Sequence, residues 1–143
     1  SPSRGLGDVY KRQGLDCLGI DNSKEMVKYA KKNKINVELM DMENLDFKNN
    51  TFDAIWCVSS LLHLPKKNIP EIINSFYELL SNKGTLYVSL KEGNKEEFDT
   101  KSRFFSYFEK NDFLDLFSKF EVLWILEKEI DGFNNIGVLL RKL

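Results

Sequence analysis

The sequence predicts an α/β fold: a Rossmann-like, doubly wound and mostly parallel sheet that ends in an antiparallel hairpin. Two observations predict it. Short apolar runs alternate with segments of helical periodicity along most of the chain. The last two apolar runs are instead joined by a short turn at Asp131-Gly132, which predicts that they pair antiparallel.

The first strand and helix of this pattern lie near the start of the chain. Residues 16–20 form a short apolar run that ends at Asp21, as expected for a buried strand. Asn22 stands three residues before Glu25, and this capping-box spacing predicts that a helix begins there. Residues 36–40 read as the second strand.

The middle of the chain repeats the alternation. Phe52–Val58 is a near-continuous apolar run, which is typical of a strand covered on both faces. Gly84 stands where a glycine would cap the C-terminus of the helix that follows. That helix is predicted by apolar residues at helical spacing, namely Ile69, Ile72, Ile73, Phe76, Leu79 and Leu80.

The last third of the chain supplies the remaining elements. Residues 85–90 predict a strand, 91–103 a polar loop without period, and 112–118 a short helix. The two closing strands are predicted over 120–127 and 134–141.

The first thirteen residues differ from the rest in composition and show no period. We interpret residues 1–13 as a non-native or disordered segment, either translated sequencing adapter or a natural flexible arm, and exclude them from the fold. Residues 14–143 are expected to form one partial domain, because the chain is long enough for one domain and too short for two.

Composition excludes several classes of function. Lys and Arg number 21 against 22 Asp and Glu, so the net charge of −1 gives no attraction to nucleic acid or to an anionic membrane. No stretch is long and apolar enough to cross a bilayer, and no secretory segment is present. Cys17 and Cys57 lie in separate apolar runs, so we expect free buried thiols and a cytoplasmic location. His63 is the single histidine, so no metal site is expected. The oligomeric state is not readable.

Two acidic residues follow predicted strands, where ligands bind in open parallel sheets. Asp21 could accept hydrogen bonds from the vicinal hydroxyls of a ribose, or it could merely cap the next helix. Asp41 could accept a hydrogen bond from an exocyclic amine, with Met42 packing against a purine face, or it could be a turn residue. The residues alone leave both alternatives open.

Possible substrate contacts come later in the chain. The strand over Phe52–Val58 ends in small residues and leads to His63, which could be a general base or a loop histidine that caps the next helix. We expect the loop over 91–103, with the aromatic residues that follow it, to cover a small-molecule substrate. The candidate substrate-binding residues are Arg103, which could meet a carboxylate or be solvated, and Tyr107.

These segments, in this order, resemble the small bacterial class I methyltransferases often called type 11. The matching segments are GIDNSKEM, DMENLDF, FDAIWCVSSLLHLP and LLSNKGTLYVSLKEG, followed by the closing hairpin. The resemblance covers nearly all of the chain from residue 14. Each motif is loose by itself, and the specificity lies in the ordered set.

The resemblance implies a fold, a cofactor and site residues. It implies S-adenosyl-L-methionine-dependent methyl transfer, with Asp21 on the ribose hydroxyls, Asp41 on the adenine amine and His63 near the transferred methyl. It further implies that the adenosine part is lined by Asn22, Met26 and the Met42 backbone, and the methionine part by Cys57, Val58 and Ser59.

One part of the family pattern is missing. The family's first strand and its glycine-rich loop, which approaches the methionine carboxylate, have no counterpart here. We therefore expect this chain to be a fragment that binds cofactor poorly. Two other classes stay open: a nucleotide-binding oxidoreductase domain, which the hairpin and the Asp41 segment disfavour, and a non-catalytic methyltransferase-like module.

Overall fold

The structure, a computed structural model, describes residues 14–143. The segment 1–13, predicted to be non-native or disordered, lies outside the described residues. The chain divides into two compact units, of which the first ends at Asp46 and the second spans Phe47–Leu143. Within the described residues, no helix has the length and apolar composition that crossing a bilayer requires.

The first unit is a strand–helix–strand crossover. Strand β1 (Gly19–Asp21) pairs in parallel with β2 (Val37–Leu39), and helix α2 (Lys24–Lys32) connects them. The helix buries Val27 and Ala30. Both predicted strands are present but shorter than expected, with β1 beginning at Gly19 instead of residue 16.

The start of α2 lies one residue later than predicted. The N-cap is Ser23, whose Oγ accepts a hydrogen bond from the Met26 amide at 3.3 Å. The predicted cap, Asn22, is exposed, so the capping-box interpretation of Asn22 and Glu25 is wrong. Serine at position 23 satisfies an amide that the first helical turn leaves unpaired.

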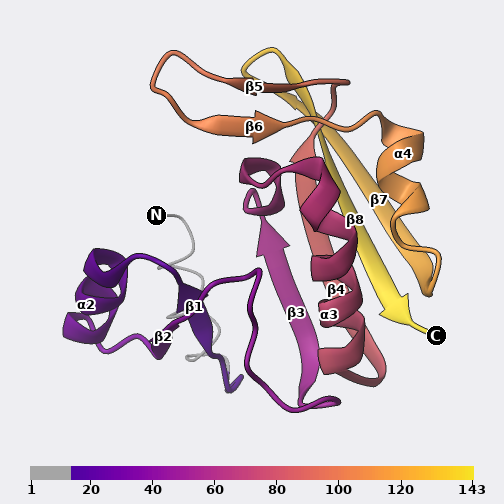
Figure 1. Cartoon of the computed structure of the whole chain (residues 1–143). Coiled ribbons are helices and arrows are strands. Elements are labelled where there is room, and N and C mark those ends of the chain that lie inside the picture. Colours follow the sequence, from indigo (N-terminus) through magenta and orange to yellow (C-terminus); the bar gives the residue numbers. More distant parts are fainter. Residues whose placement is uncertain (1–13) are drawn as a thin grey trace. The chain divides into compact units, whose positions relative to one another are not determined.

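The main sheet of the second unit has four strands of mixed direction, in the order β3–β4–β8–β7 (Figure 1). Strand β3 (Phe52–Val58) runs parallel to β4 (Leu80–Lys91). Strand β8 (Phe133–Lys142) runs antiparallel both to β4 and to β7 (Phe120–Ile130). The predicted closing hairpin is confirmed, with a turn at Asp131 and Gly132, whose φ angles are +53° and +81°. Aspartate and glycine tolerate these left-handed conformations.

One face of this sheet is covered by helices. Two short 3₁₀ turns, η1 (Leu61–His63) and η2 (Lys66–Asn68), lead into α3 (Ile69–Leu79). Figure 1 shows α3 and α4 (Lys110–Asp115) lying on the same side of the sheet. Alternate residues of β4 and β8 point toward that side and form the core, namely Leu86, Val88, Leu90, Ile136, Val138 and Leu140.

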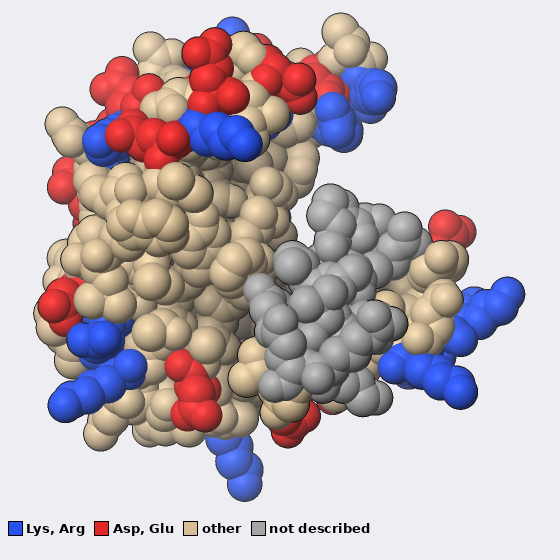
Figure 2. Space-filling model, turned by 180° about the vertical axis from the view of Figure 1, so that it is seen from behind, with Lys and Arg blue, Asp and Glu red and all other residues tan. Residues whose placement is uncertain are grey.

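The opposite face of the sheet carries a row of large side chains. Trp56, Tyr87, Leu139 and Trp124 are register partners across the four strands. Trp56 stacks on Tyr87, with 4.6 Å between ring centroids, yet it is 52% exposed. Figure 2 looks onto this side of the molecule, where charged side chains border an uncharged expanse.

The end of α3 differs from the prediction. The helix ends at Leu79, five residues before Gly84, and β4 begins at once with Leu80. Gly84 is therefore not a helix cap. A Cβ atom at this position would lie 2.8 Å from the Ser81 carbonyl oxygen and 3.2 Å from that of Asp53, so close backbone approach requires glycine here.

The segment predicted as a loop over 91–103 contains a strand. Strand β5 (Glu96–Phe98) pairs antiparallel with β6 (Phe104–Ser106) in a separate two-stranded sheet. Ser106 is fully buried and donates its hydroxyl to the Leu64 carbonyl at 2.8 Å, which attaches the hairpin beside η1. In Figure 1 the hairpin lies beyond the end of the sheet toward which β3 points.

Candidate functional site

The carboxyl ends of β1 and β2 bring two predicted carboxylates to one edge of the first unit. The Met40 amide donates to the Asp21 carbonyl at 3.0 Å, so Asp41 follows directly after the last rung between the strands. Asp21 is half-buried and Asp41 is exposed. This edge is where a parallel strand–helix–strand unit binds its ligands.

Each of the two carboxylates is fixed by its own local turn, and the two turns are of the same kind. Oδ1 of Asp21 accepts from the Ser23 amide at 2.8 Å, and Oδ1 of Asp41 accepts from the Glu43 amide at 2.9 Å. Within the described residues, the Oδ2 atom of each carboxylate has no hydrogen-bond partner. An ionised carboxylate only accepts hydrogen bonds, so two preoriented oxygens stand ready for donors such as hydroxyls and amines.

The other candidates of the first unit surround this edge. Asn22 is exposed in the turn before α2, while Met26 and Met42 are half-buried. Asp21 therefore serves the helix start through Oδ1 and still keeps an oxygen for a ligand. The sequence posed these two roles as alternatives, and the geometry accommodates both.

In the second unit, three predicted cofactor-lining residues stand at the tip of β3. Ser59 has φ of +56°, an uncommon conformation for a residue with a side chain, and its amide donates to Ser89 Oγ at 3.3 Å. Val58 is 38% exposed, whereas the Cys57 side chain is buried, and that burial raises the pKa of the Cys57 thiol to about 12. Cys57 can therefore offer a ligand its backbone but not a reactive thiolate.

His63 ends η1 and contacts the β5–β6 hairpin. Its Nδ1 lies 2.9 Å from the Phe104 carbonyl oxygen, and its ring centroid lies 4.7 Å from that of Phe105. The side chain is exposed, and among the described residues no side chain caps the start of η2 or α3, so the capping role considered for His63 is not observed.

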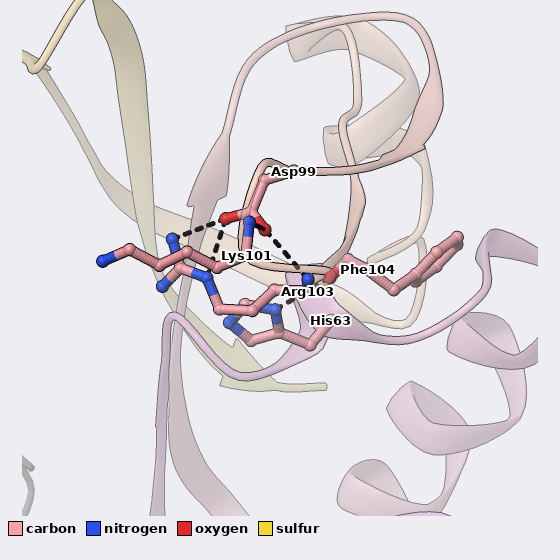
Figure 3. A network of polar contacts seen from close by, with 5 residues as sticks. All are labelled: His63, Asp99, Lys101, Arg103 and Phe104. Carbon is pink, nitrogen blue, oxygen red and sulfur yellow. Dashed lines mark hydrogen bonds and ion pairs between the residues drawn. The ribbon is translucent and has the colours of Figure 1, made fainter.

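Arg103 is held in the turn between β5 and β6 by Asp99. Its Nε donates to Asp99 Oδ2 at 2.7 Å, and its Nη2 forms an ion pair with the same oxygen at 2.6 Å (Figure 3). Its guanidinium also lies over the Phe105 ring, 5.2 Å from the centroid. Arg103 is thus an exposed arginine that is paired with Asp99, and its contact with a substrate stays a prediction.

Phe105, Tyr107 and Phe133 form an aromatic stack next to His63 and Arg103. Tyr107 lies nearly parallel to Phe105 and to Phe133, with centroid distances of 5.9 and 5.3 Å. Lys91, the last residue of β4, places Nζ over Phe105 and Phe133 at 5.2 and 4.8 Å. Tyr107 is buried, and burial together with Glu97 raises the pKa of its hydroxyl. Its contact with a substrate also stays a prediction.

Phe105 is therefore the centre of a group of cationic or ionisable side chains. His63, Lys91 and Arg103 all contact its ring, and they come from η1, from the end of β4 and from the hairpin turn. The sequence pointed to His63 and Arg103 but not to Lys91 or Asp99. Lys91 directly follows the strand predicted over residues 85–90, and this position could have indicated it as a site residue. Asp99 had no signal beyond its spacing of four from Arg103.

A surface hollow elsewhere on the second unit contains none of the predicted site residues. It is lined by Glu92, Gly93, Asn94, Glu109, Lys110 and Asn111. Its rim is tied by Lys110, which pairs with Glu127 at 3.0 Å. Within residues 14–143, no three side chains of the metal-binding types gather as a possible metal site.

Comparison with known proteins decides the family. Residues 4–84, more than half of the chain, match the methyltransferase domain. The chain belongs to the methyltransferase-domain family.

Two relatives are similar to this chain in sequence. Phosphoethanolamine N-methyltransferase 3 of Arabidopsis thaliana is 29% identical over 93 residues, which cover 59% of this chain and 19% of the relative. The phosphoethanolamine N-methyltransferase of Plasmodium falciparum is 24% identical over 139 residues, covering 89% of this chain and 52% of the relative. This methyltransferase domain spans about a fifth to half of the length of these relatives.

A solved structure shares the fold. The 1,6-didemethyltoxoflavin-N1-methyltransferase of Burkholderia thailandensis, solved with bound 1,6-didemethyltoxoflavin and S-adenosylhomocysteine, matches with a TM-score of 0.80 and 17% identity. The match covers 97% of this chain and 67% of that one. The Rossmann-like α/β architecture with a mixed sheet, predicted from the sequence, is thus that of the class I methyltransferases.

Proposed function

We propose that this methyltransferase domain transfers a methyl group from S-adenosyl-L-methionine to a small-molecule acceptor. The observation that carries the proposal is the pair of preoriented carboxylates at the ends of β1 and β2, in a chain whose family is methyltransferase. When bound, the cofactor supplies an electrophilic methyl group on sulfur. Catalysis by the protein would then rest mainly on position and on the surroundings of the acceptor.

The residues of the first unit fit the adenosine part of this cofactor. A ribose presents two hydroxyl donors and adenine presents an exocyclic amine, and these are the groups that carboxylate oxygens bind. In our proposal Asp21 Oδ2 accepts from the ribose and Asp41 Oδ2 from the amine. Asn22, Met26 and Met42 would line the same part, and the backbone of Cys57, Val58 and Ser59 the methionine part.

We further propose that the acceptor is a small amine that carries an anionic group. The relatives named above are phosphoethanolamine N-methyltransferases, and phosphoethanolamine combines a primary amine with a phosphate. Lys91 and Arg103, both placed over the Phe105 ring, support an anionic substituent near the amine. His63, on the same ring, would accept the proton that the amine releases.

Transfer of labelled methyl from S-adenosylmethionine tests both parts of this proposal. Phosphoethanolamine should accept label, and ethanolamine, which lacks only the phosphate, should be at least about tenfold poorer, the loss expected for one charge-assisted contact. Equal rates would contradict the anionic acceptor alone. Failure to label any small amine, alcohol or carboxylate would contradict methyl transfer to small molecules.

A further inference from the structure

The turn that joins β5 to β6 is closed by one carboxylate. Oδ1 of Asp99 accepts from the backbone amides of Lys101 and Arg103 at 2.9 and 2.8 Å. Oδ2 accepts from Arg103 Nε at 2.7 Å and forms an ion pair with Arg103 Nη2 (Figure 3). The Asp99 amide in turn donates to the Arg103 carbonyl at 2.8 Å, and Ser102 adopts a left-handed φ of +59°. With three hydrogen bonds and one ion pair at a single carboxylate, the backbone of this turn has little freedom.

Phe104, the residue after this turn, connects the turn to His63, the candidate base. Phe104 follows Arg103 directly, and its carbonyl oxygen lies 2.9 Å from His63 Nδ1. A carbonyl oxygen only accepts, so Nδ1 must be the donor and must carry a proton. A neutral imidazole has a single N–H, so Nε2 then holds the lone pair.

The ring of His63 is also restrained by its neighbours. It contacts Phe105, on which Arg103 from the turn and Lys91 from β4 also lie, and Tyr107 stacks on the same ring. Figure 3 shows the Phe104 ring directed away from His63 and Arg103. These contacts, together with the hydrogen bond, leave the imidazole little freedom to turn over.

We propose that Asp99 is a positioning residue, which closes the turn, fixes the Phe104 carbonyl and so holds neutral His63 as the Nδ1–H tautomer with Nε2 as the proton acceptor. This inference rests on the proposed function in one respect, the use of Nε2 in methyl transfer. A backbone carbonyl here does what a carboxylate does in many acid–base pairs, which is to select one tautomer.

Nε2 would accept the proton that the substrate nitrogen releases on methyl transfer. The lone pair of the acceptor nitrogen forms the new nitrogen–carbon bond, and the electrons of the broken carbon–sulfur bond remain on sulfur. The nitrogen then carries a positive charge, which it loses by giving one proton to Nε2. His63 leaves this step as an imidazolium, with Nδ1 still donating to Phe104, and later returns the proton to water.

The single histidine makes the proposal directly measurable. Nitrogen-15 NMR of the full chain labelled at histidine, at a pH of about 8 where free imidazole is neutral, distinguishes a protonated from an unprotonated ring nitrogen. We expect the unprotonated signal at Nε2. A dominant proton on Nε2 in the unmodified chain would overturn the proposal.

Two variants and a matched control test the part played by Asp99. Asp99→Asn keeps an oxygen for the backbone amides but loses the oxygen that accepts from Arg103 Nε and the charge that pairs with Arg103 Nη2. We expect the ratio of the two tautomers to fall about fivefold or more, as loss of one hydrogen bond implies. Arg103→Gln removes the side-chain contacts between Arg103 and Asp99 from the arginine side, and the ratio should fall in the same way. This variant replaces Asp99→Asn in the test if Asp99→Asn fails to fold. Asp131→Asn, in the exposed β7–β8 turn, should leave the ratio unchanged. An unchanged ratio in folded Asp99 and Arg103 variants would overturn the proposal.

Binding of S-adenosylhomocysteine to the same samples separates this inference from the proposed function. Asp99→Asn should retain the affinity within about twofold, because Asp99 is not among the proposed cofactor contacts. If no form binds S-adenosylhomocysteine while the tautomer result holds, the proposed function fails and the positioning role stands. If binding and methyl transfer are observed but His63 carries its proton on Nε2, the positioning role alone fails.

Discussion

Met40 donates its backbone amide to the carbonyl oxygen of Asp21 at 3.0 Å, and this bond sets Asp21 and Asp41 at one edge of the β1–β2 pair. Each carboxylate has Oδ1 occupied by the amide two residues ahead of it. The fold thus orients the two Oδ2 atoms before any ligand arrives. This relationship underlies the first prediction.

Replacement of Asp21 by asparagine should weaken cofactor binding without disturbing the fold. Asparagine keeps an oxygen for the Ser23 amide but loses the charge that strengthens hydrogen bonds from ribose hydroxyls. We expect the Kd for S-adenosylhomocysteine, measured by calorimetry, to rise at least about tenfold, which corresponds to about 1.4 kcal/mol.

The matched control for this variant is Asp46→Asn, which removes the same charge from an exposed loop residue of the same unit. Its Kd should match that of the unmodified chain. Equal weakening in both variants would mean that net charge, and not the Asp21 carboxylate, governs binding.

His63→Gln should slow methyl transfer while leaving cofactor affinity intact. Glutamine retains an N–H donor for the Phe104 carbonyl but supplies no basic nitrogen. Loss of a general base typically lowers kcat by about 10²- to 10⁴-fold. A kcat within about threefold of the original would rule out proton acceptance by His63 as a significant contribution.

Phe113→Ala should destabilise the second unit strongly. Phe113 is fully buried and packs edge-to-face on Phe117, with 5.2 Å between centroids. Truncating such a phenylalanine costs about 3–5 kcal/mol in the free energy of unfolding, measured by urea denaturation. Phe98→Ala is the control, because Phe98 is 70% exposed. It should cost less than about 1 kcal/mol.

The Cys57 thiol should resist modification and should influence stability only in alkali. Burial raises its pKa from the ordinary 9.0 to about 12 in the folded chain. At a pH of about 8, a thiol reagent should therefore modify Cys57 only after urea unfolds the chain. Rapid labelling of folded protein at Cys57 would contradict its burial.

The pH dependence follows from the same shift. Below pH 9 the thiol is neutral in both states, and between 9 and 12 only the unfolded state ionises, so the free energy of unfolding falls over that window. In Cys57→Ala this part of the alkaline decline should disappear. The difference between the two pH profiles isolates the contribution of the thiol to stability from that of the other groups that ionise in alkali.

Local signals predicted much of the fold. The Asp131-Gly132 turn was readable because two adjacent residues that tolerate left-handed backbone determine the hairpin by themselves. The end of α3 was not, because Gly84 owes its presence to the carbonyls of Ser81 and Asp53, one of which lies far away in sequence. The β5 strand was missed since it pairs only with a short aromatic strand and carries no alternation of its own.

The candidate site was predictable where side chains follow strands. Asp21, Asp41 and His63 were found in this way, and their roles stay predictions. The positioning role of Asp99 could not be predicted, because Asp99 binds backbone amides and its effect reaches His63 through the Phe104 carbonyl. Backbone atoms leave no mark in a sequence. Tyr107 was expected at the substrate, and its burial between Phe105 and Phe133 became visible only when β8 was placed beside β4.

The most direct test of the central claim is a calorimetric titration with S-adenosylhomocysteine and, separately, with NADH. It should use the 143-residue chain. We predict saturable one-to-one binding of S-adenosylhomocysteine and no binding of NADH. Binding of NADH alone, or of neither compound, would contradict the assignment.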